Sequence, residues 1–189
     1  MNKIILIIIL ILILILKISN INEHFNNEIE MSPKLSKQDI LDLKKGHKIM
    51  TNMLKEFDRI CRKHNLKYWC ISGTLIGAIR HNGWIPWDGD IDIGMLKSDY
   101  DILQKIIKKE LPKNMWFQDK TTDRHYKSNI GKIRDLNTTY KDYDGKSWHN
   151  GLQLDIFIFH ENKNYINGYK KFKKMDIFPL KEKLFENIK

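Results

Sequence analysis

The spacing of apolar residues divides the chain into a terminal apolar run and a region with the patterns of a folded domain. Positions 4–16 hold only Ile and Leu, and positions 19–35 show no period. After Ser36, apolar side chains recur every three or four residues through Cys61, which predicts an amphipathic helix that ends near Asn65. We therefore expect an apolar segment at 1–18, a linker at 19–35 and one folded domain at 36–189.

Shorter patterns fill the rest of the domain. Residues 66–72, 90–95, 130–139 and 151–159 favour strands, as does the stretch from Trp116. Residues 74–80 favour a short helix, and a longer one begins at Ser98, which we expect to cap it, and ends in Lys108 and Lys109. The basic tail, 170–189, is expected to be partly helical.

The terminal run is expected to reach a membrane. Lys3 and Lys17 flank it, and their long side chains can extend to the interface, so that a run shorter than a usual span of about 20 residues still crosses. No A-x-A cleavage site follows, which favours a signal anchor over a cleaved signal peptide. The positive charge before the run slightly favours a single-pass protein with a lumenal or extracytoplasmic domain. Cleavage would instead give a secreted protein.

Composition narrows the range of partners only in part. The net charge of +10 favours anionic partners such as nucleotides, sugar phosphates, nucleic acid or anionic membrane, although a solvated lysine-rich surface explains it equally well. No nucleic-acid-binding signature is present, and with the apolar run this disfavours nucleic acid as a partner. Cys61 and Cys70 lack the spacing of a zinc site, and two buried thiols are favoured over a disulfide.

Three aspartates carry the candidate chemistry. Asp90 and Asp92 are two apart in a strand pattern, so their side chains share one face with Cα atoms about 6.6 Å apart. Asp155 interrupts an otherwise apolar strand, where a carboxylate needs a cation or hydrogen-bond donors. Carboxylates from two strands predict one site for a hard divalent cation, Mg²⁺ or Mn²⁺.

Other interpretations of these acids remain open. Asp88 and Asp90 also fit a polar turn, and Asp155 could pair with Lys132 or Arg134. A calcium loop is rejected, because its glycine position holds Ile93 and its final glutamate position holds Asp99.

Several residues are candidates for binding phosphate. Amides near Gly73, at the start of a predicted helix, could hold an anion, although Gly73 also suits a plain turn. Arg80, Lys132 and Arg134 could neutralise phosphate charge, or be surface cations. Trp84 and Trp87 lie close to the acids in sequence and could stack on a base or fill the core.

Three motifs carry a family resemblance. The run GTLIGAIRHNGWIPWDGDIDIGM, residues 73–95, resembles the signature of the LicD family of phosphocholine transferases, which is related to the fukutin proteins of animals. The strand GLQLDIFIF and the segment DIFPLKEKLFEN are similar to two later family motifs and follow in the same order. Gly89 replaces an aspartate of the usual acidic run, and the chain stops before the family's usual C-terminal segment.

The resemblance implies a fold, a reaction and a site. The fold is α+β, or α/β-like: a nucleotidyltransferase-type mixed sheet flanked by helices. The reaction is transfer of a phospho-alcohol, such as choline or ribitol phosphate, from a CDP-activated donor to a hydroxyl of a glycan, glycoprotein or glycolipid. The catalytic and metal-binding residues would be Asp90, Asp92 and Asp155, and the phosphate-binding residues would include Ser72, Gly73 and Thr74.

A second function remains open beside the transferase. A membrane-tethered accessory protein could keep the same fold and bind a glycan or nucleotide without turnover. The early end of the chain favours this alternative, whereas the acids at positions 90, 92 and 155 favour an enzyme.

Overall fold

The structure is a computed structural model that describes residues 35–139 and 149–188. The chain divides into two units, 1–36 and 37–189, and the second is described here by itself. The predicted anchor and most of the predicted linker lie outside the described residues. Among the helices that the structure describes, none has the length and apolar character needed to cross a bilayer.

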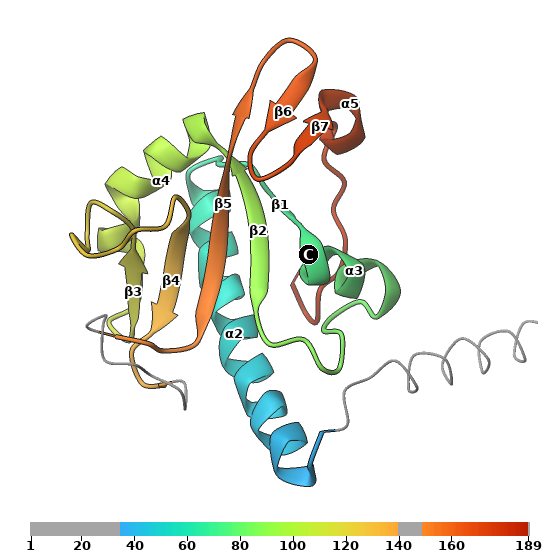
Figure 1. The fold of residues 1–189 in the computed structure, drawn as a ribbon, viewed down its shortest axis with the longest axis vertical. Coiled ribbons are helices and arrows are strands. Elements are labelled where there is room, and N and C mark those ends of the chain that lie inside the picture. The colour runs from blue at the N-terminus through green and yellow to red at the C-terminus, as the bar shows by residue number, and fades with distance from the viewer. Residues whose placement is uncertain (1–34, 140–148, 189) are drawn as a thin grey trace, which may run out of the picture. The chain divides into compact units, whose positions relative to one another are not determined.

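The second unit is a seven-stranded mixed sheet with helices packed against it (Figure 1). The main path of the sheet runs in the order β1-β2-β5-β4-β3, and a hairpin of β6 and β7 continues from β5. The strands are β1 (Tyr68–Cys70), β2 (Ile91–Leu96), β3 (Met115–Gln118), β4 (Gly131–Asp135), β5 (Gln153–Glu161), β6 (Tyr165–Asn167) and β7 (Lys171–Lys173). The helices are α2 (Lys37–Lys63), α3 (Ser72–Arg80), α4 (Lys97–Glu110) and α5 (Lys174–Ile177). This mixed sheet with flanking helices is the architecture expected from the sequence.

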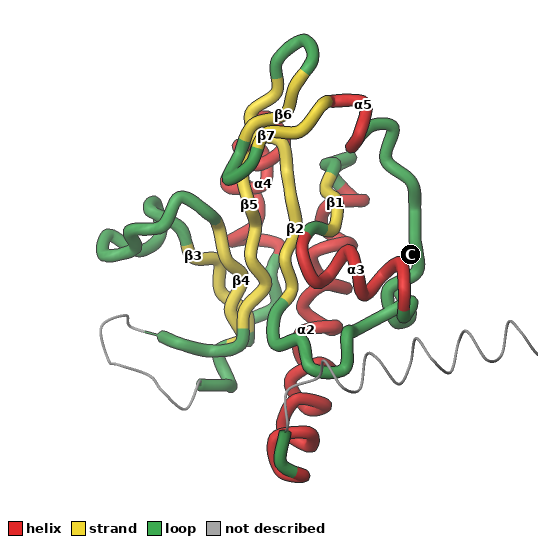
Figure 2. Tube along the Cα trace, turned by 45° about the vertical axis from the view of Figure 1, so that its right-hand side comes forward, coloured by secondary structure: helices red, strands yellow, loops and turns green. Residues whose placement is uncertain are grey.

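β2 and β5 form the centre of the sheet and are parallel to each other. The remaining pairs, β1 with β2, β4 with β5 and β3 with β4, are antiparallel, as are β6 with β5 and β7 with β6. Figure 2 shows the hairpin of β6 and β7 at the far end of β5. The sequence analysis did not predict this hairpin.

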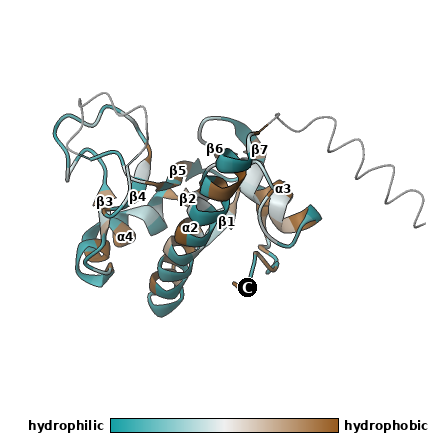
Figure 3. Cartoon of the chain, turned by 90° about the horizontal axis from the view of Figure 1, so that it is seen from below, coloured by the Kyte–Doolittle hydropathy of each residue, from teal (hydrophilic) through white to brown (hydrophobic). Residues whose placement is uncertain are grey.

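The main core lies between the sheet and two helices. α2 packs on β4 and β5, and α4 packs on β2, β3 and β5, so both helices lie on one side of the sheet (Figure 3). α2 presents an apolar stripe of Met50, Met53, Leu54, Phe57 and Ile60, all buried. Strand residues that alternate with polar ones, such as Ile91, Ile93, Leu154 and Ile156, complete this core. The residues that alternate with these core residues therefore point to the opposite face of β2 and β5.

Some predicted boundaries are wrong. The strand expected at 66–72 is only β1, because Ser72 takes a left-handed backbone conformation (φ 50°) and already begins α3. Ser98 does not cap α4: the helix begins at Lys97 directly after β2, with Leu96 at the cap position and no capping side chain. Asp90 lies just before β2 rather than in it. Cys61 and Cys70 are free thiols, Cys61 buried and Cys70 half-buried.

Candidate functional site

Asp92, Asp155 and Lys132 form one row across three neighbouring strands. Asp92 of β2 is the register partner of Asp155 of β5, and Asp155 is the register partner of Lys132 of β4. Register partners project to the same face, and neighbouring strands lie about 4.8 Å apart. The two carboxylates and the ammonium are therefore neighbours on the face away from α2 and α4.

Lys132 and Asp155 form a largely buried ion pair. The Nζ atom of Lys132 donates to both carboxylate oxygens of Asp155, at 2.7 and 2.8 Å, and the two side chains are 12% and 10% exposed. Of the two partners left open by the sequence, the structure thus selects Lys132. Arg134 instead donates to the side chain of Gln118 and to the carbonyl of Gly151, although it lies near enough to Asp155 for its charge to act there.

Burial dominates the electrostatics of both carboxylates. Desolvation raises the pKa of Asp92 to about 6, and the negative charges of Asp90 and Asp155 add to this shift. Burial also raises the pKa of Asp155, while the Lys132 ammonium opposes that rise. A cation is stabilised beside carboxylates whose pKa values are raised by burial and by neighbouring acids, because its charge offsets both effects.

Asp90 contributes charge from the segment before β2. Its carboxylate acts on Asp92, Asp155 and Asp88, so the four acids share one electrostatic environment. Within 35–139 and 149–188, however, no three side chains of His, Cys, Asp or Glu are grouped closely enough to hold a metal ion by themselves. The metal-binding roles predicted for Asp90, Asp92 and Asp155 remain predictions.

The start of α3 lies against this row. The Oγ1 atom of Thr74 accepts a hydrogen bond of 2.9 Å from the amide of Asp92, and the side chain of Ser72 hydrogen-bonds to the Asp92 carboxylate. A Cβ atom at Gly73 would overlap the carboxylate of Asp88. All three residues predicted to bind phosphate at this turn therefore lie beside acids. The acid nearest Gly73 is Asp88, for which the sequence left a polar turn open and predicted no site role.

Arg80 lies apart from this turn. It is at the other end of α3, about 12 Å along the axis from Ser72. There it lines a shallow hollow of about 380 Å³ with the exposed side chains of Leu75, Ile76 and Ile79. The structure does not bring Arg80 together with the row of Asp92, Asp155 and Lys132, and its predicted phosphate contact remains a prediction.

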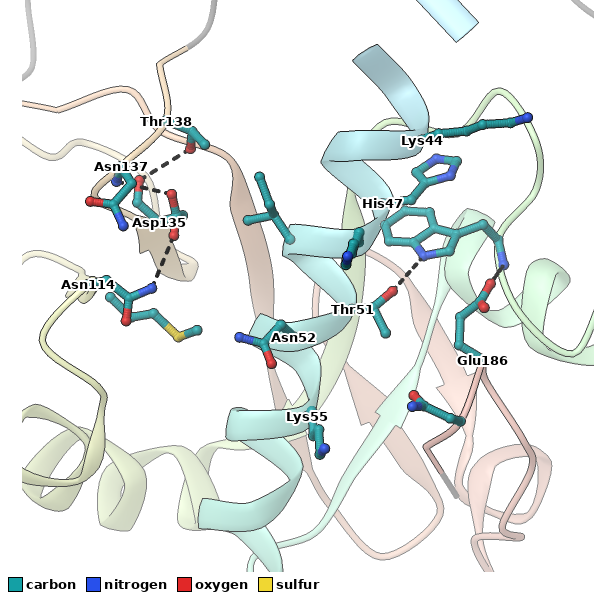
Figure 4. A pocket seen from close by; sticks show the side chains of 15 residues that line it. Lys44, His47, Thr51, Asn52, Lys55, Asn114, Asp135, Asn137, Thr138 and Glu186 are labelled. Atoms are coloured by element: carbon teal, nitrogen blue, oxygen red, sulfur yellow. Dashed lines mark hydrogen bonds between the residues drawn. The ribbon is translucent and has the colours of Figure 1, made fainter. Parts of the chain in front are cut away.

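A larger groove, of about 1030 Å³, runs along α2. Figure 4 shows Lys44, His47, Thr51, Asn52 and Lys55 projecting from α2 into it, with Asn114 and Asn137 on one side and Glu186 on the other. Trp84 forms part of the lining but is only 8% exposed, so it packs in the core and offers no open face to a base. Neither hollow is lined by Asp92 or Asp155.

Asp119 shows what a purely structural buried aspartate looks like in this fold. Its Oδ1 atom accepts hydrogen bonds from the amide and hydroxyl of Thr121, and its Oδ2 atom accepts from Tyr100 and Gln104. Although burial works against it, hydrogen bonds from Thr121 and Gln104 lower the pKa of Asp119. Asp92 and Asp155 differ, because burial, with a smaller contribution from neighbouring acids, raises their pKa values, and that difference marks their row as the candidate site.

The fold and the row of charges define the class of the protein: a mixed α/β domain with an acidic site on the sheet face that its two long helices leave uncovered. A family model described as "LicD/FKTN/FKRP, nucleotidyltransferase domain" matches residues 65–189. The chain belongs to the LicD family.

Curated relatives support this membership. The chain is 33% identical over 131 residues to the lipopolysaccharide cholinephosphotransferase LicD of Haemophilus influenzae, covering 63% of this chain and 44% of that protein. It is 30% identical over 152 residues to an uncharacterised protein of Rickettsia typhi, covering 72% of this chain and 39% of that protein. It is also 32% identical over 104 residues to mouse ribitol-5-phosphate transferase FKTN, covering 53% of this chain and 19% of that protein. The chain thus spans less than half the length of these relatives.

Proposed function

We propose that the chain transfers a phospho-alcohol, choline phosphate or ribitol phosphate in type, from a CDP-activated donor to a glycan hydroxyl. The observation that carries the proposal is the register of Asp92 and Asp155 on the two central strands of a LicD-family domain. Two relatives indicate which group is transferred: one is a lipopolysaccharide cholinephosphotransferase, and another is a ribitol-5-phosphate transferase.

The proposed reaction exchanges one phosphorus–oxygen bond for another. The acceptor hydroxyl oxygen forms a bond to the phosphorus that carries the alcohol, and the bond from that phosphorus to the bridging oxygen of the donor breaks. CMP leaves with the electron pair. Asp155 accepts the hydroxyl proton, a role suited to a carboxyl whose pKa is raised by burial. Lys132 holds that carboxylate in place through its two hydrogen bonds.

A divalent cation fits the charges of the site. Mg²⁺ is commonly held by one or two carboxylates together with phosphate oxygens of the substrate, so a site without three grouped ligands is compatible with it. Asp90 and Asp92 would hold the ion, since Asp155 already has an ammonium partner. When bound, the ion would neutralise charge on the donor diphosphate and on the departing CMP.

The proposal is tested by incubating the full chain with CDP-choline or CDP-ribitol and measuring CMP release with Mg²⁺, with Mn²⁺ and with EDTA. We expect metal-dependent CMP release from one donor that rises when a glycan acceptor is added. The matched variants are Asp92→Asn, which should lose activity, and Asp101→Asn, an exposed acid on α4 that should keep it.

Two outcomes would redirect the assignment. Absence of CMP release from both donors, in a folded protein that binds Mn²⁺, would favour the binding or accessory protein of the same fold. Equal release by wild type and by Asp92→Asn would remove Asp92 from the reaction.

A further inference from the structure

His47 on α2 makes a direct contact with the segment that carries the acids. Its Nε2 atom lies 2.6 Å from the backbone oxygen of Asp88. A carbonyl oxygen only accepts, so Nε2 carries the proton and donates. The imidazole also stacks on the indole of Trp84, with ring centroids 4.1 Å apart and planes only 9° from parallel. One side chain therefore contacts residues near both ends of the segment 84–88.

Trp84 is itself fixed from two further directions. Its Nε1 atom donates to the hydroxyl of Thr51 at 2.9 Å, and Thr51 lies one helical turn after His47 on α2. The Trp84 amide donates to the carboxylate of Glu186 at 3.3 Å, and the Glu186 amide donates to the carbonyl of Asn82. Trp84 is thus contacted by His47, Thr51 and Glu186, which are labelled in Figure 4.

The segment between α3 and β2 depends on such contacts because it belongs to no helix or strand. Residues 81–90 form turns and irregular backbone. Within 84–90, the backbone amide of Asp88 donates a hydrogen bond to the carbonyl of Ile85. The carboxylate of Asp88 then lies against Gly73, and Asp90 acts on Asp92 and Asp155. A shift of the Asp88 backbone would move both acids relative to the sheet.

We propose that His47 is a positioning residue, which fixes the Asp88 carbonyl and the Trp84 ring so that Asp88 and Asp90 stay aligned with Asp92 for cation and donor binding. This inference rests on the proposed function of the acid row. His47 lies on α2, ahead of residues 65–189, which match the family model. The hydrogen bond to the Asp88 carbonyl joins two residues that are 41 positions apart in the sequence.

The test compares variants of the full chain in detergent by titration with Mn²⁺ alone. His47→Ala removes the donor and the stacking ring, and we expect its Kd for Mn²⁺ to rise about tenfold, as for other groups that orient metal ligands. His47→Gln keeps an N–H donor and should restore most of the affinity. Where CMP release is measurable, KM for the donor should rise more than kcat falls in His47→Ala.

Two controls on the same helix separate positioning from stability. Ile49→Ala removes packing against the core and should lower the melting temperature without changing the Kd for Mn²⁺. Lys45→Ala changes an exposed side chain paired with Asp42 and should leave both quantities unchanged. A wild-type Kd in His47→Ala, or a Kd in Ile49→Ala raised as much as in His47→Ala, would overturn the proposal.

A readout that needs no ligand keeps this inference distinct from the proposed function. Hydrogen–deuterium exchange of the peptide that covers 82–90 should accelerate in His47→Ala and stay near wild type in His47→Gln. If wild type binds no Mn²⁺ and releases no CMP, the proposed function fails. Accelerated exchange in His47→Ala would still support the positioning role of His47. Unchanged exchange in His47→Ala would overturn the positioning role of His47, whether or not the protein releases CMP.

Discussion

Asp155 lies among apolar neighbours on β5, and Lys132 balances its charge from the adjacent strand. Both side chains are nearly buried, so each depends on the other: removing one partner leaves a charge that has lost most of its contact with water. The same row includes Asp92, and among the residues that the structure describes its carboxylate is paired with no ammonium and lies near other acids. The row of Asp92, Asp155 and Lys132 therefore carries more negative than positive charge.

The ion pair can be tested by a double substitution. Asp155→Asn should lower the free energy of unfolding by about 2–4 kcal/mol, because the Lys132 ammonium keeps only one amide oxygen as a partner. Adding Lys132→Met should recover at least half of that loss, since the buried cation is then gone. Urea unfolding of the single and double variants measures both. Equal stability of Asp155→Asn and wild type would show that the pair contributes nothing.

Activity should separate the two roles of this pair. The double variant should fold but lose CMP release by about 10²–10⁴-fold, the range of a general base. Full activity in a folded double variant would exclude Asp155 as the base.

Asp92 should make the stability of the metal-free protein depend on pH. Its pKa is raised to about 6, so between about pH 4 and pH 6 the folded state binds more protons than the unfolded state. This contribution to stability is therefore present at pH 4 and lost as the pH rises through 6. Asp92→Asn should flatten that decline and raise the melting temperature at pH 7 by about 2–4 °C, roughly 1 kcal/mol after discounting for solvent screening.

Bound Mn²⁺ should oppose this loss of stability at higher pH, because the ion binds the ionised carboxylate of Asp92. In wild type, the increase in melting temperature caused by Mn²⁺ should grow as the pH rises through 6, and in Asp92→Asn it should be small at every pH. Melting curves from pH 4.5 to about 7.5, with and without Mn²⁺, provide the measurement. A Mn²⁺ effect of the same size in both proteins would contradict a metal role for Asp92.

Among the elements, the junction of β1 and α3 decides where the site forms. Ser72 has φ of 50° and begins the helix, which turns Gly73 and Thr74 toward β2. Gly73→Ala should lower the free energy of unfolding by up to about 1 kcal/mol, because its Cβ would displace the Asp88 carboxylate, which is the end of a side chain and can move. The control is Gly89→Ala, since a Cβ at Gly89 meets nothing within 4 Å. Chemical denaturation of both variants tests this, and equal midpoints would contradict the close approach.

The elements with strong periodic patterns were predictable from sequence. The apolar stripe from Met50 to Cys61 predicted α2, the alternation around Asp92 predicted β2, and the apolar run around Asp155 predicted β5. The facing of Asp92 followed from that alternation, because residues that alternate with core residues must point away from the core. These are properties of single segments, which local sequence encodes.

The elements set by distant contacts were not predictable. Ser98 looked like a helix cap, but β2 runs directly into α4 at Leu96, and the cap position follows from the strand rather than from the serine. The hairpin of β6 and β7 has strands of three residues, too short for a periodic signal. His47 and Asp88 meet across 41 positions, and nothing in the helical pattern of α2 marks His47 for that contact.

For the whole molecule, the membrane anchor is the main prediction still to be tested. We propose that residues 4–16 hold the chain in a membrane with the domain on the lumenal or extracytoplasmic side. The full chain should then stay in the pellet after carbonate extraction, and a variant with three lysines placed within 4–16 should be released. Protection of the domain from added protease in sealed vesicles tests its side. Release of the unaltered chain by carbonate would exclude the anchor.

The parallel pairing of β2 with β5 also has a consequence for how the chain folds. Asp92 and Asp155 are separated by 63 positions, and β5 must enter between β2 and β4 before their carboxylates can meet. Contacts of such long range form late and slowly, because loop-closure entropy is lost before the pairing stabilises the chain. On the ribosome, α2, β2 and α4 emerge first, with the β2 edge unpaired until β5 arrives. We therefore expect the acid row to assemble last, and substitutions in β5 to reduce the yield of folded protein more than equally buried substitutions in α2.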